Sequence, residues 1–432
     1  MQENMTLQEN LTQGKMAFVL EDKRIVLGIG GSVAAYKSAD LIRDLVRNKA
    51  RVDVIPTKAA LHFVTPLLLE ALSQRPVHAE VMALDNGHIP HIELAYAADV
   101  VVVCPATADL LASMAQGLAH NALLSTLLSV RCPLLIAPAM ETRMWEHPAT
   151  QANVKLLQER GAHFVGPQAG ALASGREGQG RLAPIEEVFE AILAAVTPKD
   201  FQGKRVVVTA GPTVEDLDPV RFLSNRSSGK MGIAIAQNAA RRGASVILVK
   251  GPTNVEFVKS SGLSVVNVRS ADEMARCVLE EVNEEMDVAI LAAAVADFMP
   301  QNFSTQKIKK SSSTMDPNDK SSLDAIALSR TTDILKTLGE ERASRKERLP
   351  FIAGFAAETE NVEENGRKKL EAKQVDLICA NDVSGKNSQE VFASDKNSVL
   401  LLSKEKPSIT LPRTSKEFLA NAILDEVREL MG

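Results

Sequence analysis

The chain has 432 residues, more than one compact core usually supports, so two domains are expected. Its 45% hydrophobic and 24% charged residues are typical of an ordinary globular protein. A net charge of -5 and an aromatic content of 4% argue against nucleic-acid binding, because they supply neither a basic surface nor platforms for stacking bases.

The cysteines of the chain indicate a reducing compartment, and its hydropathy argues against a membrane span. Residues 1–22 form a polar, acidic N-terminal tail, and no apolar run reaches 18 residues. The four cysteines (Cys104, Cys132, Cys277 and Cys379) are far apart and lack metal-binding spacing. We therefore expect a cytoplasmic protein that does not bind a membrane.

Apolar strands alternate with helical patterns in the first half of the chain. The strands are expected at 25–28, 51–56, 99–104 and 133–136, with helices over 34–48 and from 105 to 116. This alternation predicts a Rossmann-like or flavodoxin-like αβα sandwich, in which ligands bind at the carboxyl ends of the strands. Gly30 and Gly31 follow the first strand and would let a phosphate approach, although many ordinary turns contain glycines. Thr57 is a plausible helix N-cap after the second strand.

Residues 191–204 pass from a helix into a joint that contains proline and glycine. We therefore place a first domain at 23–196, a linker at 197–204 and a second domain at 205–432.

The second domain repeats the alternation and predicts another Rossmann-like fold with a parallel sheet. Strands are expected at 205–209, 245–249, 264–268, 287–292 and 375–379, with another that begins at 352. Helices are expected at 231–242, 271–283, 363–373 and 415–430. Residues 398–402 and 408–411 are expected to pair as an antiparallel hairpin at the sheet edge.

The stretch 218–232, DPVRFLSNRSSGKMG, follows the first strand of this domain and leads into a helix. A turn of small residues before a helix N-terminus is a common anion-binding element, because free N–H groups point outward there. The stretch is not a P-loop, and an ordinary connection is the alternative. Its concentration of guanidinium, amide, hydroxyl and ammonium donors favours a phosphorylated ligand.

Several motifs resemble known enzyme families. GHIPHIEL (87–94), PATAD (105–109) and PAMETRMW (138–145) resemble the flavin-dependent cysteine decarboxylases. DPVRFLSNRSSGKMG, AAVADF (293–298), KIKK (307–310) and GFAAET (354–359) resemble phosphopantothenate-cysteine ligase. Together they resemble the bifunctional coenzyme A biosynthesis family that combines both activities. The resemblance implies a flavodoxin-like flavoprotein domain followed by a parallel-sheet ligase domain.

For the first domain, the resemblance implies an FMN cofactor and an oxidative decarboxylation. The FMN contacts it implies are Gly31, Ser32, Thr57, Thr107 and Met140. His91 matches the family's catalytic histidine, although a lone histidine is more often a solvated or capping residue. His88 is a nearby alternative.

Two positions depart from the decarboxylase pattern. Glu141 stands where relatives commonly have an asparagine suited to the substrate carboxylate. Ser174, in the flap 173–182, occupies the place of a cysteine that protonates the reduced intermediate, and a hydroxyl is a far weaker acid than a thiol. The flap glycines would give the mobility of a lid.

For the second domain, the resemblance implies that phosphopantothenate reacts with CTP in the presence of Mg²⁺ to form an acyl-cytidylate. Cysteine then attacks this intermediate. Asn225 and Lys307 are the implied catalytic residues. The implied nucleotide contacts are Ser227, Asp297, Lys307, Phe355, Lys369 and Lys373, and the implied substrate contacts across both domains are Asn121, Glu141, Arg221, Asn225 and Ala293. The metal ligands stay unknown.

Plainer interpretations exist for several of these residues. Asp297 could be a helix cap, and Lys369 and Lys373, four residues apart on one helix face, could be surface lysines. Residues 301–324 are too polar to pack and are expected to be a mobile loop that carries Lys307, Lys309 and Lys310. Thr331-Thr332-Asp333 stands where relatives often have Asn-Pro-Asp.

Two other functions remain open. The first is an active ligase fused to a flavin-binding domain that is impaired or regulatory, which Glu141 and Ser174 suggest. The second is an NAD-dependent oxidoreductase, which the missing GxGxxG fingerprint disfavours. The resemblance also implies flavin-domain trimers and ligase-domain dimers, and therefore a dodecamer.

Overall fold

The computed structural model describes residues 19–80, 89–258, 260–308, 326–344, 350–384 and 394–432. Backbone contacts divide it into two units, Ala17–Thr197 and Pro198–Gly432. Some of the residues considered above lie outside this described part of the chain. They are the loop lysines Lys309 and Lys310, the alternative histidine His88 and most of the N-terminal tail.

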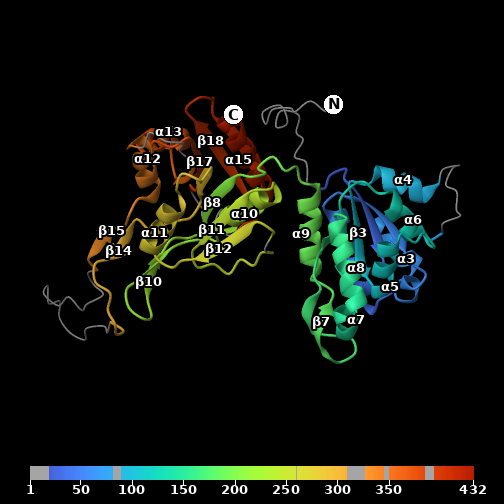
Figure 1. Cartoon of the computed structure of the whole chain (residues 1–432). Coiled ribbons are helices and arrows are strands. Elements are labelled where there is room, and N and C mark those ends of the chain that lie inside the picture. The colour runs from blue at the N-terminus through green and yellow to red at the C-terminus, as the bar shows by residue number, and fades with distance from the viewer. Residues whose placement is uncertain (1–18, 81–88, 259, 309–325, 345–349, 385–393) are drawn as a thin grey trace. The chain divides into compact units, whose positions relative to one another are not determined.

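The first unit is built on a parallel sheet that lies between helices (Figure 1). Its five strands stand in the order β2-β1-β3-β4-β5. This is the flavodoxin-like order, which confirms the predicted fold class. The strands are β1 (Arg24–Ile29), β2 (Arg51–Pro56), β3 (Val100–Ala106), β4 (Leu134–Pro138) and β5 (His163–Phe164). Their long apolar runs are buried on both faces, as parallel strands between two helical layers require.

Helices cover both faces of this sheet. One apolar layer includes residues of α2 (Ser38–Arg47), α3 (Pro66–Ser73) and α9 (Ile185–Val196). The opposite layer includes residues of α4 (Pro90–Ala97), α5 (Ala108–Gln116), α6 (Ala122–Ser129) and α8 (Pro148–Glu159). The unit also contains the short α7 (Thr142–Glu146) and the antiparallel hairpin of β6 (Gln168–Ala171) and β7 (Glu177–Arg181).

The helix expected over 34–48 is divided, because its first turn is the 3-10 helix η1 (Val33–Lys37) and α2 begins only at Ser38. The helix expected after Thr57 is only the 3-10 turn η2 (Ala60–His62), and Thr65 rather than Thr57 caps α3. The helix expected from 105 begins at 108, because β3 continues to Ala106 and Thr107 is the N-cap.

The second unit contains an eight-stranded sheet in the order β12-β11-β8-β13-β16-β17-β18-β19. Its strands are β8 (Arg205–Ala210), β11 (Ser245–Lys250), β12 (Leu263–Asn267), β13 (Val288–Leu291), β16 (Phe351–Glu358), β17 (Leu377–Asp382), β18 (Lys396–Ser403) and β19 (Ile409–Ser415). The six strands from β12 to β17 are parallel, and β18 and β19 form the antiparallel edge hairpin that the sequence predicted.

The helices of this unit lie in two layers. α10 (Lys230–Arg241) and α15 (Lys416–Met431) contribute to the apolar cluster on one face. α11 (Ala271–Glu281), α12 (Ile334–Ser344) and α13 (Val362–Ala372) contribute to the cluster on the other. Two small antiparallel strand pairs were not expected from the sequence: β9 (Val214–Asp216) with β10 (Phe222–Ser224), and β14 (Phe298–Pro300) with β15 (Leu328–Arg330).

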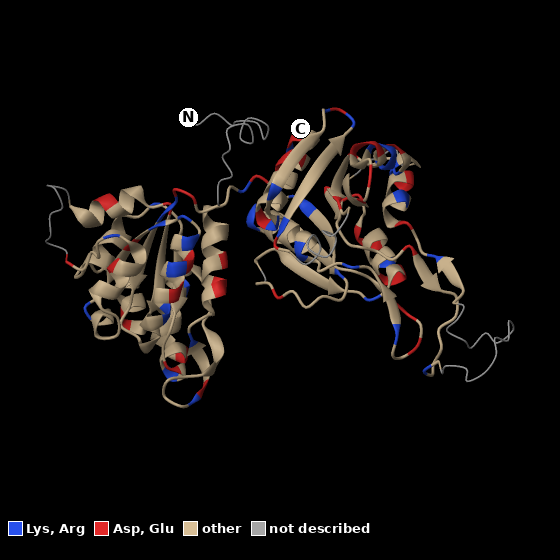
Figure 2. Ribbon diagram, turned by 180° about the vertical axis from the view of Figure 1, so that it is seen from behind, with Lys and Arg blue, Asp and Glu red and all other residues tan. Residues whose placement is uncertain are grey.

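Charged residues of both signs are interspersed along the helices and loops of each unit (Figure 2). No helix in the described part of the chain is long and apolar enough to span a membrane.

Candidate functional site

In the first unit, backbone hydrogen bonds join the turns at the carboxyl ends of three neighbouring strands. Gly30 N donates to Pro105 O at 2.9 Å, and Thr57 N donates to Ile29 O at 2.9 Å. The turns after β1, β2 and β3 therefore lie together at one edge of the sheet. This edge lies where the strand order reverses between β1 and β3, the usual ligand-binding position in this fold.

The glycines in the first turn are required by close packing. A β-carbon on Gly31 would stand 2.3 Å from the Ala59 β-carbon, and one on Gly30 would stand 2.6 Å from the Pro105 carbonyl oxygen. Because real β-carbons do not approach so closely, larger residues would separate the turns. The glycines thus bring the three turns together, whatever ligand lies beside them.

Each predicted hydroxyl in these turns lies at the start of a helix or turn. Ser32 Oγ accepts from Ala34 N at 3.3 Å, Thr57 Oγ1 accepts from Ala60 N at 3.2 Å, and Thr107 Oγ1 accepts from Leu110 N at 3.3 Å. All three residues are half-buried, so these hydroxyls order the turn backbone at an edge that solvent still reaches.

The loop after β4 packs against the flap hairpin. Met140 N donates to Gly180 O at 2.9 Å, which joins the loop to β7. Glu141 is the N-cap of α7, where its Oε2 accepts from Arg143 N at 2.6 Å, and its Oε1 lies 4.0 Å from Arg176 Nη1. The Glu141 charge is therefore compensated by a helix N-terminus and by a cation from the flap turn. Ser174 is exposed in that turn.

His91 lies on α4 and Asn121 at the start of α6, and these two helices contact each other. Asn121 is the N-cap of α6, with Oδ1 accepting from Leu124 N at 2.9 Å. His91 is half-buried, and its buried Nδ1 has no hydrogen-bond partner among the described residues. A buried polar atom without a partner is costly, so Nδ1 is available to form a hydrogen bond with a ligand.

In the second unit, the exits of the neighbouring strands β8 and β13 are joined side by side. Ala293 N donates to Thr209 Oγ1 at 3.0 Å, and Ala296 N donates to Thr213 Oγ1 at 2.9 Å. Asn225 Nδ2 donates to the Val295 carbonyl at 2.8 Å. Three predicted site residues (Asn225, Ala293 and Asp297) are thereby brought into one loop pair, although about 70 positions separate the first from the others.

Arg221 and Asp218 attach the segment that carries Lys307. The Arg221 guanidinium pairs with the Asp218 carboxylate and donates to Ile308 O at 2.6 Å, while Ile308 N donates to Asp218 Oδ2 at 3.2 Å. These contacts lower the pKa of Asp218 well below its usual range, chiefly through the hydrogen bond from Arg221. Lys307 itself is exposed.

The turn before α10 is held by local contacts. Gly229 N donates to Ser227 Oγ at 3.3 Å, and Thr253 Oγ1 donates to the Ser228 carbonyl at 2.6 Å. Gly229 has a φ of 78°, a left-handed conformation that favours glycine. Lys230, the first residue of α10, pairs with Asp395 at 2.6 Å.

The remaining predicted nucleotide contacts surround β16. Phe355 is half-buried against the apolar cluster under α10 and α15. The Lys369 ammonium lies 2.8 Å from Glu358 Oε1, and Lys373 pairs with Asp333. Both lysines thus have carboxylate partners in this structure, and Asp333 also caps α12 by accepting from Lys336 N at 3.0 Å.

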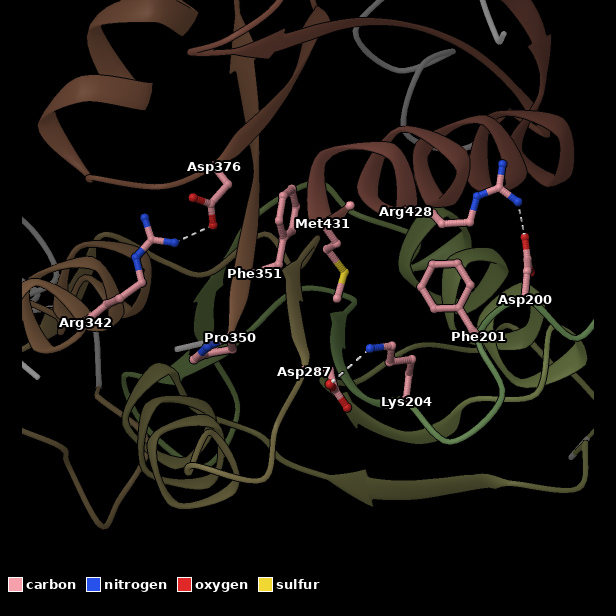
Figure 3. Close-up of a pocket in the computed structure, with 11 residues that line it drawn as sticks. Asp200, Phe201, Lys204, Asp287, Arg342, Pro350, Phe351, Asp376, Arg428 and Met431 are labelled. Carbon is pink, nitrogen blue, oxygen red and sulfur yellow. Dashed lines mark hydrogen bonds and ion pairs between the residues drawn. The ribbon is translucent and has the colours of Figure 1, made fainter. Parts of the chain in front are cut away.

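A cavity of about 460 Å³ lies at the opposite, amino edge of this sheet (Figure 3). Three ion pairs line it, between Lys204 and Asp287, Arg342 and Asp376, and Arg428 and Asp200, around an apolar surface that includes Phe201 and Phe351. Its charges already have partners, and ligands of such sheets bind at the carboxyl edge. The predicted site residues, not this cavity, therefore form the candidate site.

The sequence did not identify three residues that build this site. Thr209 and Thr213 orient the loop 293–296, and Asp218 holds Ile308. Asp218 was visible as the first residue of the donor-rich motif, whereas the threonines gave no signal beyond their place after a strand. Within the described residues, no group of three or more His, Cys, Asp or Glu side chains could hold a metal ion.

Comparison with known proteins covers both halves of the chain. Residues 17–197 match the family described as Flavoprotein, and residues 201–431 match the family described as DNA/pantothenate metabolism flavoprotein C-terminal domain. The coenzyme A biosynthesis bifunctional protein CoaBC of Vibrio cholerae is 43% identical over 413 residues, covering 95% of this chain and 99% of the relative. The corresponding protein of Bacillus subtilis is 40% identical over 417 residues, covering 95% and 98%.

Solved structures are similar to each half separately. The C-terminal domain of a coenzyme A biosynthesis bifunctional protein CoaBC is 39% identical and covers 54% of this chain and 97% of its own, with a TM-score of 0.42. The FMN-dependent cysteine decarboxylase SpaF is 30% identical and covers 41% and 97%, with a TM-score of 0.37.

Proposed function

The chain belongs to the coenzyme A biosynthesis bifunctional protein CoaBC family, and from that premise we propose which substrates and residues it uses for its ligase and decarboxylase activities. The second unit joins L-cysteine to 4'-phosphopantothenate with CTP. The first unit then decarboxylates the product to 4'-phosphopantetheine with FMN.

The joined turns of the first unit would hold the cofactor. Gly31, Ser32, Thr57 and Thr107 would surround the phosphate and ribityl chain, and Met140 would contact the ring. The half-buried hydroxyls at the strand-order reversal and the unpartnered Nδ1 of His91 fit such a ligand. When bound, FMN would take two electrons from the substrate so that the carboxylate can leave, and would then return them to the product, so that the reaction has no net redox change.

The chain's own residues position the substrate and the protons. His91 would take or give a proton at Nδ1, and Asn121 would contact the substrate from the neighbouring helix. Glu141 would face the substrate carboxylate with its charge partly compensated by Arg143 N and by Arg176. Ser174, in the flap turn, would cover the site and exclude water.

In the ligase reaction, the carboxylate of phosphopantothenate attacks the α-phosphorus of CTP and releases pyrophosphate. The amine of cysteine then attacks the acyl carbon of the cytidylate, and CMP leaves. Asn225 would hold the carboxylate or anhydride without adding charge, with Ala293 and Arg221 as further substrate contacts, and Lys307 would stabilise charge at phosphorus. The observation that most directly supports this assignment is the hydrogen bond from Asn225 Nδ2 to Val295 O at 2.8 Å. It joins the turn before α10 to the loop after β13, and so supports a site built from both segments.

The nucleotide would occupy the rest of this edge. Phe355 would contact the cytosine, Asp297 the ribose or base, and Ser227 the phosphates. Lys369 and Lys373 would exchange Glu358 and Asp333 for phosphate oxygens. Mg²⁺ would arrive with CTP, because this ion is commonly held by substrate phosphates and only one or two carboxylates.

We also infer a cytoplasmic oligomer. The cysteines of the described residues are all free, which suits a reducing compartment. Large apolar side chains are exposed on the first unit, including Leu67 on α3 (78%) and Tyr96 on α4 (82%), which suits flavin-domain trimers. With ligase-domain dimers these would form a dodecamer, and light scattering that gives the mass of one chain would contradict it.

Isotope exchange tests the ligase assignment. The chain should transfer label from pyrophosphate into CTP when phosphopantothenate is present and cysteine is absent, because the acyl-cytidylate forms reversibly. ATP in place of CTP tests the nucleotide. No exchange with either nucleotide would contradict a nucleotidyl intermediate.

A further inference from the structure

A pair of lysines lies beside the donor-rich turn, at the start of two packed helices. Lys230 is the first residue of α10, Lys416 is the first residue of α15, and these helices contact each other on one face of the sheet. The turn before α10 packs on the residue that follows β8, since a β-carbon on Gly229 would stand 3.2 Å from Gly211 Cα. α15 follows β19, and both β8 and β19 run toward the carboxyl edge. Both lysines therefore lie at the edge where the nucleotide is proposed to bind.

Asp395 contacts both lysines. Its Oδ1 accepts from Lys230 Nζ at 2.6 Å, and its carbonyl oxygen accepts from Lys416 N at 2.9 Å. Its side chain is 86% exposed, so water screens most of the compensation that the carboxylate gives. Lys416, by contrast, is only 7% exposed.

This arrangement is electrostatically unfavourable without a ligand. Burial removes water from the Lys416 ammonium, and Lys230 adds a second positive charge nearby, so the pKa of Lys416 falls to about 8, against a smaller opposing effect of Asp395. The first turn of a helix also disfavours cations. A polyanion would relieve each of these costs.

We propose that Lys230 and Lys416 together bind the β- and γ-phosphates of the nucleotide, which leave as pyrophosphate. This inference rests on the proposed function and extends it by a residue, Lys416, that lies about 190 positions beyond the motif. Asn225 and Lys230 stand at opposite ends of one turn. Phosphates that extend along this turn from a reacting α-phosphorus beside Asn225 would reach the two ammonium groups.

The phosphomonoester of phosphopantothenate is the other source of phosphate at this edge. A single phosphate carries less charge than the two terminal phosphates of a nucleotide, and two lysines with two helix N-termini match the larger charge better. Separate titrations with each compound distinguish the two ligands.

The test uses the full-length chain, Lys416→Met and a matched control, Lys199→Met. Lys199 is also partly buried with a lowered pKa, but it donates to Arg241 O at the far end of α10. Calorimetric titrations with inorganic tripolyphosphate, CTP, CMP and phosphopantothenate give the four affinities. We expect Lys416→Met to lower the affinity for tripolyphosphate and for CTP about tenfold or more, which is the effect of losing one hydrogen bond to a charged group. The affinities for CMP and phosphopantothenate should stay unchanged. Lys199→Met should match the unmodified chain.

Lys416→Arg keeps the charge and should retain tripolyphosphate binding, so it distinguishes lost charge from lost folding if Lys416→Met unfolds. Three results would overturn the inference. Folded Lys416→Met could bind tripolyphosphate as well as the unmodified chain does, or folded Lys416→Arg could bind it as weakly as Lys416→Met does. The third is a loss of affinity that is confined to phosphopantothenate. Failure of the unmodified chain to bind CTP would instead contradict the proposed function.

The pH dependence gives a second readout with a defined sign. Phosphate binding raises the pKa of Lys416 above its free value of about 8. The contribution of the Lys416 ammonium to CTP affinity is therefore fully present below about pH 8. It is lost as the pH rises from 8 toward the pKa of Lys416 in the complex, and the affinity then falls by up to about tenfold per pH unit. Lys416→Met should remove this fall, and an equal fall in that variant would contradict the assignment.

Discussion

Gly180 lies so close to Met140 that a β-carbon at position 180 would stand 2.3 Å from the Met140 carbonyl oxygen. The same pair is joined by the hydrogen bond from Met140 N to Gly180 O at 2.9 Å. The flap strand β7 therefore packs directly on the loop that is proposed to contact the flavin ring.

Gly180→Ala should separate these two segments. The variant should lose about 1–3 kcal/mol of stability in the first unit from overpacking and a further amount from backbone strain, because Gly180 has a φ of 133°. It should also retain less flavin. Flavin absorbance per chain and thermal unfolding measure both effects.

Gly175→Ala is the matched control in the same hairpin. Gly175 also has a positive φ, 77°, but nothing lies within 4 Å of an added β-carbon. It should therefore lose only the backbone term of about 1–2 kcal/mol and keep its flavin. Equal flavin loss in both variants would show that backbone strain, not contact with Met140, is responsible.

Asn225→Ala removes the amide that is proposed to hold the reacting carboxylate. Ligase turnover should fall about a hundred- to thousandfold, as for other donors that stabilise developing charge. Decarboxylation of supplied phosphopantothenoylcysteine on the same chain should be unchanged and serves as the control. Unimpaired ligation by this variant would refute the role of Asn225.

Asp218→Asn should lower ligase turnover without removing any proposed ligand contact, because Asp218 and Arg221 hold Ile308 and hence the neighbouring Lys307. We expect a decrease of about tenfold or more, from the loss of charged hydrogen bonds. Asp216→Asn, on the same hairpin as Asp218, is the control, since it breaks only the exposed ion pair between Asp216 and Arg269, which follows β12. Similar activities of the two variants would exclude a positioning role for Asp218.

The Asp218 pair also predicts a pH window. Because the folded pKa of this carboxyl is lowered, its contribution to stability is present above about pH 4, the ordinary pKa of aspartate. The contribution is lost as the pH falls from there toward the folded pKa. Asp218→Asn should be destabilised relative to the unmodified chain at pH 7, with a difference that shrinks in acid unfolding experiments.

Ser174→Cys places a thiol where the decarboxylase resemblance implies a proton donor. A thiol is a far stronger acid than a serine hydroxyl, so we expect decarboxylation to become faster while ligation stays constant. Ala173→Cys is the control, because its thiol lies in the same turn but one position away. Equal rates in the two variants and the unmodified chain would show that position 174 supplies no proton.

The regular elements of both units could be predicted from the sequence because their patterns are strong and local. The strands β8 and β11 are continuous apolar runs, and the edge hairpin β18–β19 has a short connection. The hairpin β9–β10 could not be predicted, since its strands have three residues each and depend on contacts with residues far away in the sequence, such as the hydrogen bond from Val214 N to Arg269 O at 2.8 Å.

The site could be predicted only as separate motifs. The cap formed by Thr107 is local and can be recognised from a strand, a threonine and a helix. The contacts of Asn225 with Val295 and of Arg221 with Ile308 span 70 and 87 positions, so no local pattern reveals them. For the same reason no local pattern indicates that Lys416 lies beside Lys230.

The most direct test of two activities on one chain is a single-pot reaction with phosphopantothenate, CTP and cysteine labelled at its carboxyl carbon. We expect a yellow protein that releases pyrophosphate and labelled carbon dioxide in equal amounts as phosphopantetheine forms. A colourless protein that releases neither product would contradict it.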